Sequence, residues 1–312
     1  MKIAVPDLIS NSYFPAVAAV ELGILKDEGV AAEVELIFPV DRAYAALRSG
    51  AVDFVAGSAH SALSAFPEWK GIKLLCAQGQ GMYWFLVMRR DLKPQRNDLS
   101  IVKGRRIGAA PWVDLGLKRL LAAAGIDVVR DKVQIGPVPG LVGTTANFGL
   151  TAACALEKGL IDGFWANGVG TETAVRSGAG SIVLDVRRGD GPLGCFNYTM
   201  ASVATTEGNI EKDRGLAEAT VRALVRTHEI LKRDPDKASE VGEKLFPKTE
   251  AKLIAALIRR DTPYYDASIS EVTVREMNAF CRDVGILVGA PSFGDVVATG
   301  LQSLWYPTNR KL

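Results

Sequence analysis

Several common signals of metal and redox chemistry are missing from this chain of 312 residues. It has four cysteines, Cys76, Cys154, Cys195 and Cys281, and two histidines. No CxxC pair and no Cys/His cluster with metal-ligand spacing occurs, so no metal site is predicted. Two disulfides are possible by number, but buried free thiols are the simpler interpretation. The cysteines therefore do not identify a redox compartment.

An excess of either charge is also missing. Lys and Arg number 37 and Asp and Glu 35, so the formal net charge is +2. This balance creates no strong field for nucleic acid or an anionic membrane, and we expect neither as a partner. The short basic runs, Lys103-Gly104-Arg105-Arg106 and Arg187-Arg188, are interpreted as solvated loop ends. With 48% hydrophobic residues the composition is that of a globular protein.

Long apolar runs and known catalytic motifs are absent as well. No run reaches the roughly 20 residues that a membrane span needs. No leader precedes the first expected strand at 2–5, so either a leader was removed or the protein is made without one. The sequence contains no nucleophile elbow, P-loop, HExxH or paired-carboxylate motif. We therefore predict no cofactor and no catalytic residue, with the exception of His60 discussed below.

Strand and helix patterns alternate through the first two thirds of the chain. Apolar strand segments begin at Lys2 and Val34, and a second series begins at Ile107. The spacing predicts a helix over 113–123 that stops at Gly125, and Asn147 is expected to cap another. From about Asn209 onward the pattern is helical. This predicts an α/β fold with two lobes, each a mostly parallel sheet flanked by helices.

Two segments of the chain resemble each other. Residues 47–55 (LRSGAVDFV) and 156–164 (LEKGLIDGF) both read Leu-x-x-Gly-x-(Val/Ile)-Asp and then enter an apolar strand. The Gly ends a helix, because the left-handed backbone conformation costs little only for Gly or Asn. The Asp is expected to hydrogen-bond the turn into the strand. One supersecondary unit is therefore used once in each half of the chain.

With these features the chain resembles the type 2 periplasmic binding proteins. More specifically, it resembles the NMT1-like branch, which holds nitrate, taurine and alkanesulfonate receptors and the thiamine-pyrimidine synthases. The resemblance extends over nearly the whole chain and rests on the Phe14-Pro15-Ala16 turn, on residues 21–29 (ELGILKDEG) and on residues 99–107. The departure from the pattern is that Ile24 and Leu25 replace the usual aromatic residues.

The resemblance implies two crossings between lobes, near residues 88–90 and 201–203. Lobe I is then 1–88 plus 203–312, and lobe II is 89–202. It also implies hinge closure around a small organic solute, delivery to an ABC permease, and a monomer. The location implied is the periplasm, or the cytoplasm if Met1 is the native start.

In open α/β sheets ligands bind where strands end and helices begin. The residues that we expect there are neutral-polar or aromatic, with no Arg clamp for an anion, and they favour a planar or partly apolar solute. Several have a structural alternative: Tyr13 and Trp112 as packing, Ser58 as a helix cap, and Glu172 as an acid favoured by a helix N-terminus. Trp165 is expected in the core and His228 at the surface, and Gly143-Thr144-Thr145 is a plain loop or an anion nest. The expected solute contacts are Ser10, Asn11, Ser12, Tyr13, Ser58, His60, Gln80, Trp112, Asn167, Glu172, Asn197 and Tyr198.

An enzyme on the same scaffold is the alternative function: a decarboxylase, an isomerase or a pyrimidine-synthase relative acting on a small aromatic or heterocyclic acid in the cytoplasm. His60 is then the catalytic candidate, because a helix N-terminus favours its neutral form. The thiamine-pyrimidine synthases also carry a lysine for pyridoxal phosphate and a cysteine-rich run. Here Gly57-Ser58-Ala59 offers no lysine, and residues 192–197 keep only Cys195. A cytosolic metabolite sensor is a third possibility.

Overall fold

The computed structural model describes residues 1–139 and 147–306, and it divides into two compact units. Unit 1 is Met1–Gln80 with Thr199–Leu312, and unit 2 is Gly81–Tyr198. Both boundaries come earlier in the chain than expected. The strand at Phe85–Arg89, expected in lobe I, pairs within the second sheet instead. The loop Gly143-Thr144-Thr145 lies outside the described residues.

Unit 1 is built on a five-stranded sheet with the order β2-β1-β3-β10-β4. Strands β1, β2 and β3 run parallel, and β10 is antiparallel to both β3 and β4. Strand β10 therefore comes from a distant part of the chain and completes a sheet that the first 80 residues leave open. The strands are β1 (Lys2–Val5), β2 (Glu33–Leu36), β3 (Phe54–Ser58), β4 (Ile72–Gly79) and β10 (Ala201–Thr206).

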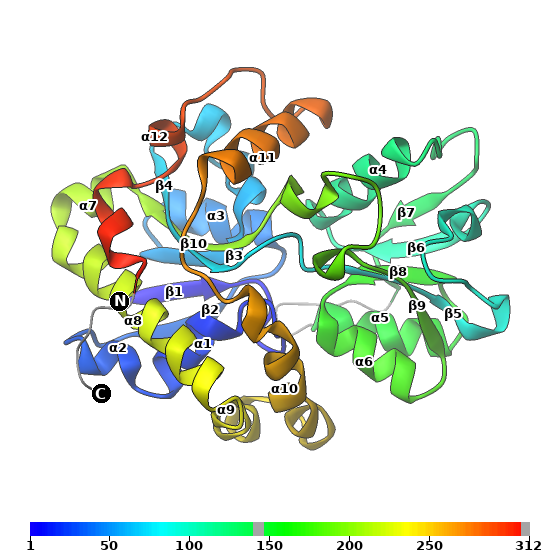
Figure 1. Ribbon diagram of the computed structural model, residues 1–312, viewed down its shortest axis with the longest axis horizontal. Coiled ribbons are helices and arrows are strands. Elements are labelled where there is room, and N and C mark those ends of the chain that lie inside the picture. Colours follow the sequence, from blue (N-terminus) through cyan, green and yellow to red (C-terminus); the bar gives the residue numbers. More distant parts are fainter. Residues whose placement is uncertain (140–146, 307–312) are drawn as a thin grey trace. The chain divides into compact units, whose positions relative to one another are not determined.

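Helices cover both faces of this first sheet. In Figure 1, α3 lies on one side of the strands, and α1 and α8 lie on the other. Helix α8 packs on α1 and α2, so the helical tail returns to unit 1 as expected. The helices are α1 (Phe14–Glu21), α2 (Ile24–Asp27), α3 (Val40–Arg48), α7 (Glu207–Lys212), α8 (Arg214–Arg233), α9 (Lys237–Leu245), α10 (Lys248–Asp261), α11 (Glu271–Asp283) and α12 (Phe293–Val296).

Unit 2 repeats the same plan with the order β7-β6-β8-β5-β9. Here β5 is the antiparallel strand, lying between β8 and β9. Helix α4 lies on one side of the sheet and α5 and α6 lie on the other (Figure 1). The elements are β5 (Phe85–Arg89), β6 (Arg106–Ala109), β7 (Gln134–Gly136), β8 (Gly163–Ala166), β9 (Gly180–Asp185), α4 (Val113–Ala123), α5 (Phe148–Glu157) and α6 (Gly168–Arg176).

The sequence repeat has the same structure in both units. Gly50 and Gly159 follow α3 and α5 with φ of 76° and 68°, as the left-handed turn requires. Each Asp then hydrogen-bonds to the strand next to its own: Asp53 Oδ2 accepts the backbone N–H of Lys2 at 2.7 Å. Asp162 Oδ2 accepts the N–H of Arg106 at 2.9 Å. Both acidic residues therefore hold the first residue of a neighbouring parallel strand.

Three expectations about local structure are wrong, those for His228, for Ser58 and for the burial of Cys154. His228 is buried rather than at the surface, because the face of α8 that carries it packs against the end of β4. Ser58 precedes a 3₁₀ turn over Ala59–Ser64, and its hydroxyl bonds to Ser61 Oγ at 2.7 Å instead of capping the turn. Cys154 is exposed, whereas the other three cysteines are buried. Trp165 is fully buried, as expected.

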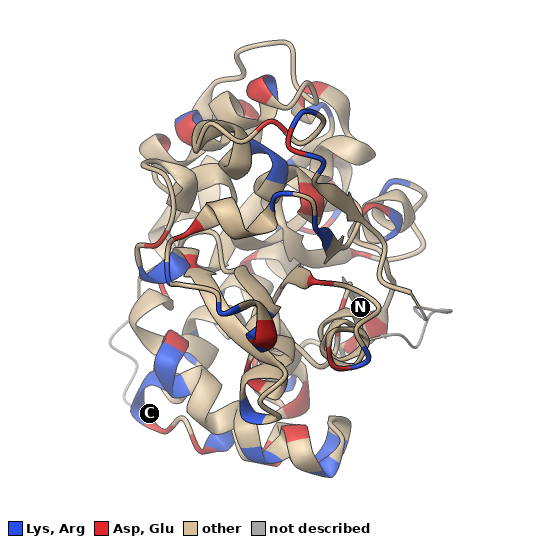
Figure 2. Ribbon diagram, turned by 90° about the vertical axis from the view of Figure 1, so that its right-hand side faces the viewer, with Lys and Arg blue, Asp and Glu red and all other residues tan. Residues whose placement is uncertain are grey.

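Charges of both signs are interspersed along the chain. Figure 2 shows basic and acidic segments alternating over the visible side of the ribbon. Over residues 1–139 and 147–306, no helix has both the length and the apolar character that crossing a membrane requires.

Candidate functional site

One edge of the first sheet gathers four loops of unit 1. Strands β1, β3 and β4 all end there, because β10 is antiparallel to its two neighbours and begins at the same edge. The loops are residues 10–13 after β1, residues 59–61 after β3, the end of β4 at Gln80, and Thr199-Met200 before β10. Seven expected contacts from unit 1, Ser10 to Tyr13, Ser58, His60 and Gln80, lie on these loops or strand ends.

The loop after β1 contains buried polar atoms that the described part of the protein leaves without a partner. Ser10, Asn11 and Ser12 are each 4% exposed or less. Asn11 Nδ2 donates to Asp261 Oδ2 at 2.7 Å, and the N–H of Ser12 donates to Ser10 Oγ at 3.1 Å. Asn11 Oδ1 and Ser12 Oγ have no hydrogen-bond partner among the described residues. Because a buried, unpaired polar atom destabilises a protein, these two atoms point to an additional ligand.

His60 lies in the loop after β3 and is fully buried. Its Nδ1 is 3.0 Å from Thr199 Oγ1, and its ring meets Phe280 edge-on with 5.5 Å between centroids. Ser61 Oγ is 3.5 Å from its Nε2. The Thr199 hydroxyl therefore fixes the orientation of the imidazole from the start of β10.

Gln80 has a structural role at the end of β4. Its side-chain Nε2 donates to the carbonyls of Asp266 and Ser268 at 2.9 and 2.8 Å. Its neighbour Gln78 bonds the N–H of Ala16 and the carbonyl of Ser202. These amides connect the strand end to segments far away in the sequence, so Gln80 is chiefly an anchor of the loop 264–268.

The second sheet has an equivalent edge in unit 2, where β6, β8 and β9 end and β5 begins. Trp112 follows β6, precedes α4 and has φ 68° and ψ −39°, a conformation that costs energy for a bulky residue. Asn167 follows β8 and caps α6, since its Oδ1 accepts the N–H groups of Val169 and Gly170. Both lie where ligands of such sheets bind.

The remaining expected contacts of unit 2 have partners within that unit. Glu172 lies on α6 and pairs with Arg176 at 2.6 Å. Asn197 and Tyr198 belong to a 3₁₀ turn over Cys195–Tyr198. The guanidinium of Arg119 lies 5.8 Å from the centre of the Tyr198 ring. These contacts are those of side chains held in place, as a pre-formed site requires.

Sequence reasoning missed three residues at these edges. Arg187, interpreted as a solvated loop end, is 4% exposed and lies 5.4 Å from the centre of the Tyr83 ring. A buried cation therefore follows β9. Asp261 and Thr199 were missed because their partners, Asn11 and His60, lie far away in the chain. No local signal marks Asp261 or Thr199. For Arg187, the run of two arginines directly after an apolar strand gave some reason to consider it.

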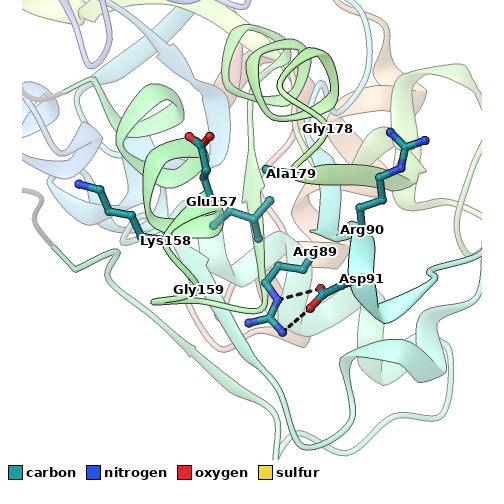
Figure 3. Close-up of a pocket in the computed structure, with 9 residues that line it drawn as sticks. Arg89, Arg90, Asp91, Glu157, Lys158, Gly159, Gly178 and Ala179 are labelled. Atoms are coloured by element: carbon teal, nitrogen blue, oxygen red, sulfur yellow. Dashed lines mark hydrogen bonds and ion pairs between the residues drawn. The ribbon is translucent and has the colours of Figure 1, made fainter.

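A pocket of about 380 Å³ lies at the edge of the second sheet opposite to the one that carries Trp112 and Asn167. Figure 3 shows Arg89 joined to Asp91 by a two-point ion pair, with both hydrogen bonds at 3.0 Å. Glu157 and Lys158 also line the pocket. The charge of Arg89 is thus neutralised by Asp91. Strands β8 and β9 begin at this edge and β5 ends there, so it is not the edge where ligands of such sheets bind. Among the described residues no group of His, Cys, Asp and Glu side chains is placed to hold a metal ion.

Comparison with solved structures identifies the architecture. The periplasmic nitrate-binding protein NrtA from Synechocystis PCC 6803 is 13% identical, with 97% of this chain and 86% of that one covered and a TM-score of 0.72. The periplasmic aliphatic sulphonate binding protein SsuA from Escherichia coli is also 13% identical, with 100% and 93% covered and a TM-score of 0.67. The fold is that of the type 2 periplasmic binding proteins. The resemblance inferred from the motifs is therefore confirmed for the fold.

The same fold also serves an enzyme among the similar structures. A cysteine-to-serine mutant of the desulfurization enzyme DszB in complex with biphenyl-2-sulfinic acid is 14% identical, with 97% of this chain and 98% of that one covered and a TM-score of 0.63. The chain matches no protein-family model and no curated protein sequence. Type 2 binding proteins and an enzyme thus share this architecture, and the function of the present chain rests on its own site.

Proposed function

We propose that this protein is the solute receptor of an ABC importer and that residues at the carboxyl edge of its first sheet bind a small organic molecule. The observation that carries the proposal is the pair of buried, unpartnered atoms in the loop after β1, Asn11 Oδ1 and Ser12 Oγ. A solute that hydrogen-bonds to them removes the desolvation cost they impose on the empty protein. The fold adds support, because NrtA and SsuA are both binding proteins.

The chemistry of the edges favours a planar or partly apolar solute. In unit 1 the aromatic Tyr13 stands beside Asn11 and Ser12. In unit 2 the strained Trp112 offers a second aromatic surface, and backbone strain of this kind persists where function needs it. The receptor role further implies a periplasmic location and a permease as partner.

A thermal-shift screen tests the proposal. The purified protein is heated with small aromatic acids, sulfonates, pyrimidines and amino-acid derivatives, and each hit is checked for chemical conversion. A ligand at 100 times its Kd adds about 2.7 kcal/mol to the free energy of unfolding, which raises the melting temperature by several degrees. A shift with the solute recovered intact supports the receptor. Conversion of the solute supports the enzyme instead, with His60 as the first residue to replace.

Ser12→Ala then locates the site. Removing an unpaired buried hydroxyl should leave the empty protein as stable as before or slightly more stable, while solute affinity falls about tenfold. Ser49→Ala is the matched control, because Ser49 is exposed at the end of α3, at the opposite edge of the sheet. Equal affinity in both variants and the wild type excludes Ser12 from the site.

A further inference from the structure

A pocket of about 540 Å³ opens on unit 1 between α8, the segment that follows α10, and the end of the described chain. Its walls include Val225 and His228 on α8, Tyr265 and Ala267 on the segment, and Trp305 and Tyr306. The volume is in the range of small-molecule sites, roughly 300–1,000 Å³. None of the residues expected to contact the solute is part of its lining.

The walls of this pocket are held in place by hydrogen bonds to the backbone of β4. The N–H of Ala77 donates to the carbonyl of Ala267 at 2.9 Å, so the segment runs along the edge of the strand. Trp305 Nε1 donates to the carbonyl of Leu75 at 2.7 Å. A pocket whose walls are already in place binds a ligand without first ordering them, which lowers the entropic cost of binding.

His228 gives the pocket a hydrogen-bond acceptor. The side chain is 2% exposed, and its Nε2 is 2.9 Å from the carbonyl oxygen of Gln78. A carbonyl only accepts, so Nε2 carries the proton and Nδ1 is left with a lone pair. Nδ1 has no hydrogen-bond partner among the described residues. Burial lowers the pKa of His228 to about 4, so the imidazole is neutral at physiological pH and Nδ1 keeps its lone pair.

Aromatic rings line the same pocket. The Tyr265 ring stacks on the imidazole with 5.0 Å between centroids and 21° between planes. Trp305 and the largely exposed Tyr306 complete the aromatic lining. We propose that this pocket is a second binding site, separate from the solute site, for a small planar heteroaromatic molecule whose N–H donates to Nδ1 of His228.

Indole and 1-methylindole are the matched probes, because they share a planar bicyclic shape and only indole has an N–H. The chain has two histidines, so a ¹H–¹⁵N spectrum of the imidazole side chains contains only His60 and His228. Titration with indole should shift the Nδ1 resonance of His228 in a saturable way and leave His60 unchanged. The affinity for 1-methylindole should be about tenfold lower, the effect of one hydrogen bond.

Tyr306→Ala tests the aromatic wall without disturbing the core, since Tyr306 is 65% exposed. This variant should weaken indole binding several-fold at an unchanged melting temperature. The proposal is overturned if the His228 resonance does not shift up to the solubility limit of indole. It is also overturned if the two probes bind with equal affinity. A shift of His60 in place of His228 places indole in the solute site and also overturns it. None of these outcomes depends on whether the receptor function is correct.

Discussion

Asp53 and Asp162 accept the same hydrogen bond at equivalent places in two different sheets. Each receives the backbone N–H of the residue that opens the neighbouring strand, Lys2 in β1 and Arg106 in β6. Each also donates its own N–H to the carbonyl of that residue, at 3.0 and 2.8 Å. The motif found twice in the sequence is therefore a device that aligns two parallel strands and fixes their register.

Asp162→Ala should destabilise the protein by about 2 kcal/mol, because the change leaves the N–H of Arg106 without its charged acceptor. Asp53→Ala should cost less, since Asp162 is only 8% exposed and also lies 3.8 Å from the guanidinium of Arg89. Urea unfolding of both variants measures the difference. The Asp→Asn variants are the controls, because they keep an acceptor oxygen, and an equal loss in Asn and Ala variants would contradict this account.

Gly170→Ala should destabilise the protein by about 1–3 kcal/mol. A Cβ at this position would lie 2.4 Å from the carbonyl oxygen of Gly149, so α5 and α6 would have to separate. Gly208→Ala is the matched control, since Gly208 is also helical and a Cβ there meets no atom within 4 Å. That control should be neutral or stabilising by up to about 1 kcal/mol. Thermal unfolding of both variants checks the contrast, and similar losses would show that close helix packing is not the cause.

The strain at Trp112 can be separated from its contacts by comparing two small replacements. Trp112→Gly and Trp112→Ala remove the same ring, but only Gly adopts a φ of 68° at little cost. The Gly variant should therefore be more stable by about 1–3 kcal/mol. Both variants should bind the solute more weakly if Trp112 contacts it. Equal stability of the two variants would mean that the backbone at this position is not strained.

His228 should make the protein less stable in acid. Burial lowers its pKa from 6.5 to about 4 in the folded protein. Between these two values the unfolded chain takes up a proton that the folded chain does not, so lowering the pH favours unfolding. This effect on the free energy of unfolding is absent near neutral pH. At and below pH 4 it lowers that free energy by about 3 kcal/mol.

His228→Gln isolates this effect from the titration of carboxylates, because the Gln amide keeps a donor for the carbonyl of Gln78 and does not titrate. Denaturant unfolding across this pH range should show a flatter dependence for the variant than for the wild type. Parallel pH profiles of the two proteins would refute the assignment to His228.

Local signals in the sequence determined much of this protein. Helix α4 has the bounds that its apolar spacing predicts, Val113–Ala123, and Asn147 caps α5 through a bond to the N–H of Leu150. The repeated motif and the alternation of strands and helices predicted two α/β lobes, and the resemblance to the type 2 binding proteins supplied the rest of the fold. These signals can be read because caps, turns and helical periods depend on residues only a few positions apart.

Tertiary structure alone decided the features that depend on distant partners. Strand β5 pairs with β8 and β9 of the second sheet, which moved the first division of the chain away from the expected residues. His228 and Arg187 looked solvated among charged neighbours, yet packing buries both. Asn11 meets Asp261 across 250 residues. Burial and hydrogen bonding depend on which surfaces meet once the chain is folded, and no pattern within a short window carries that information.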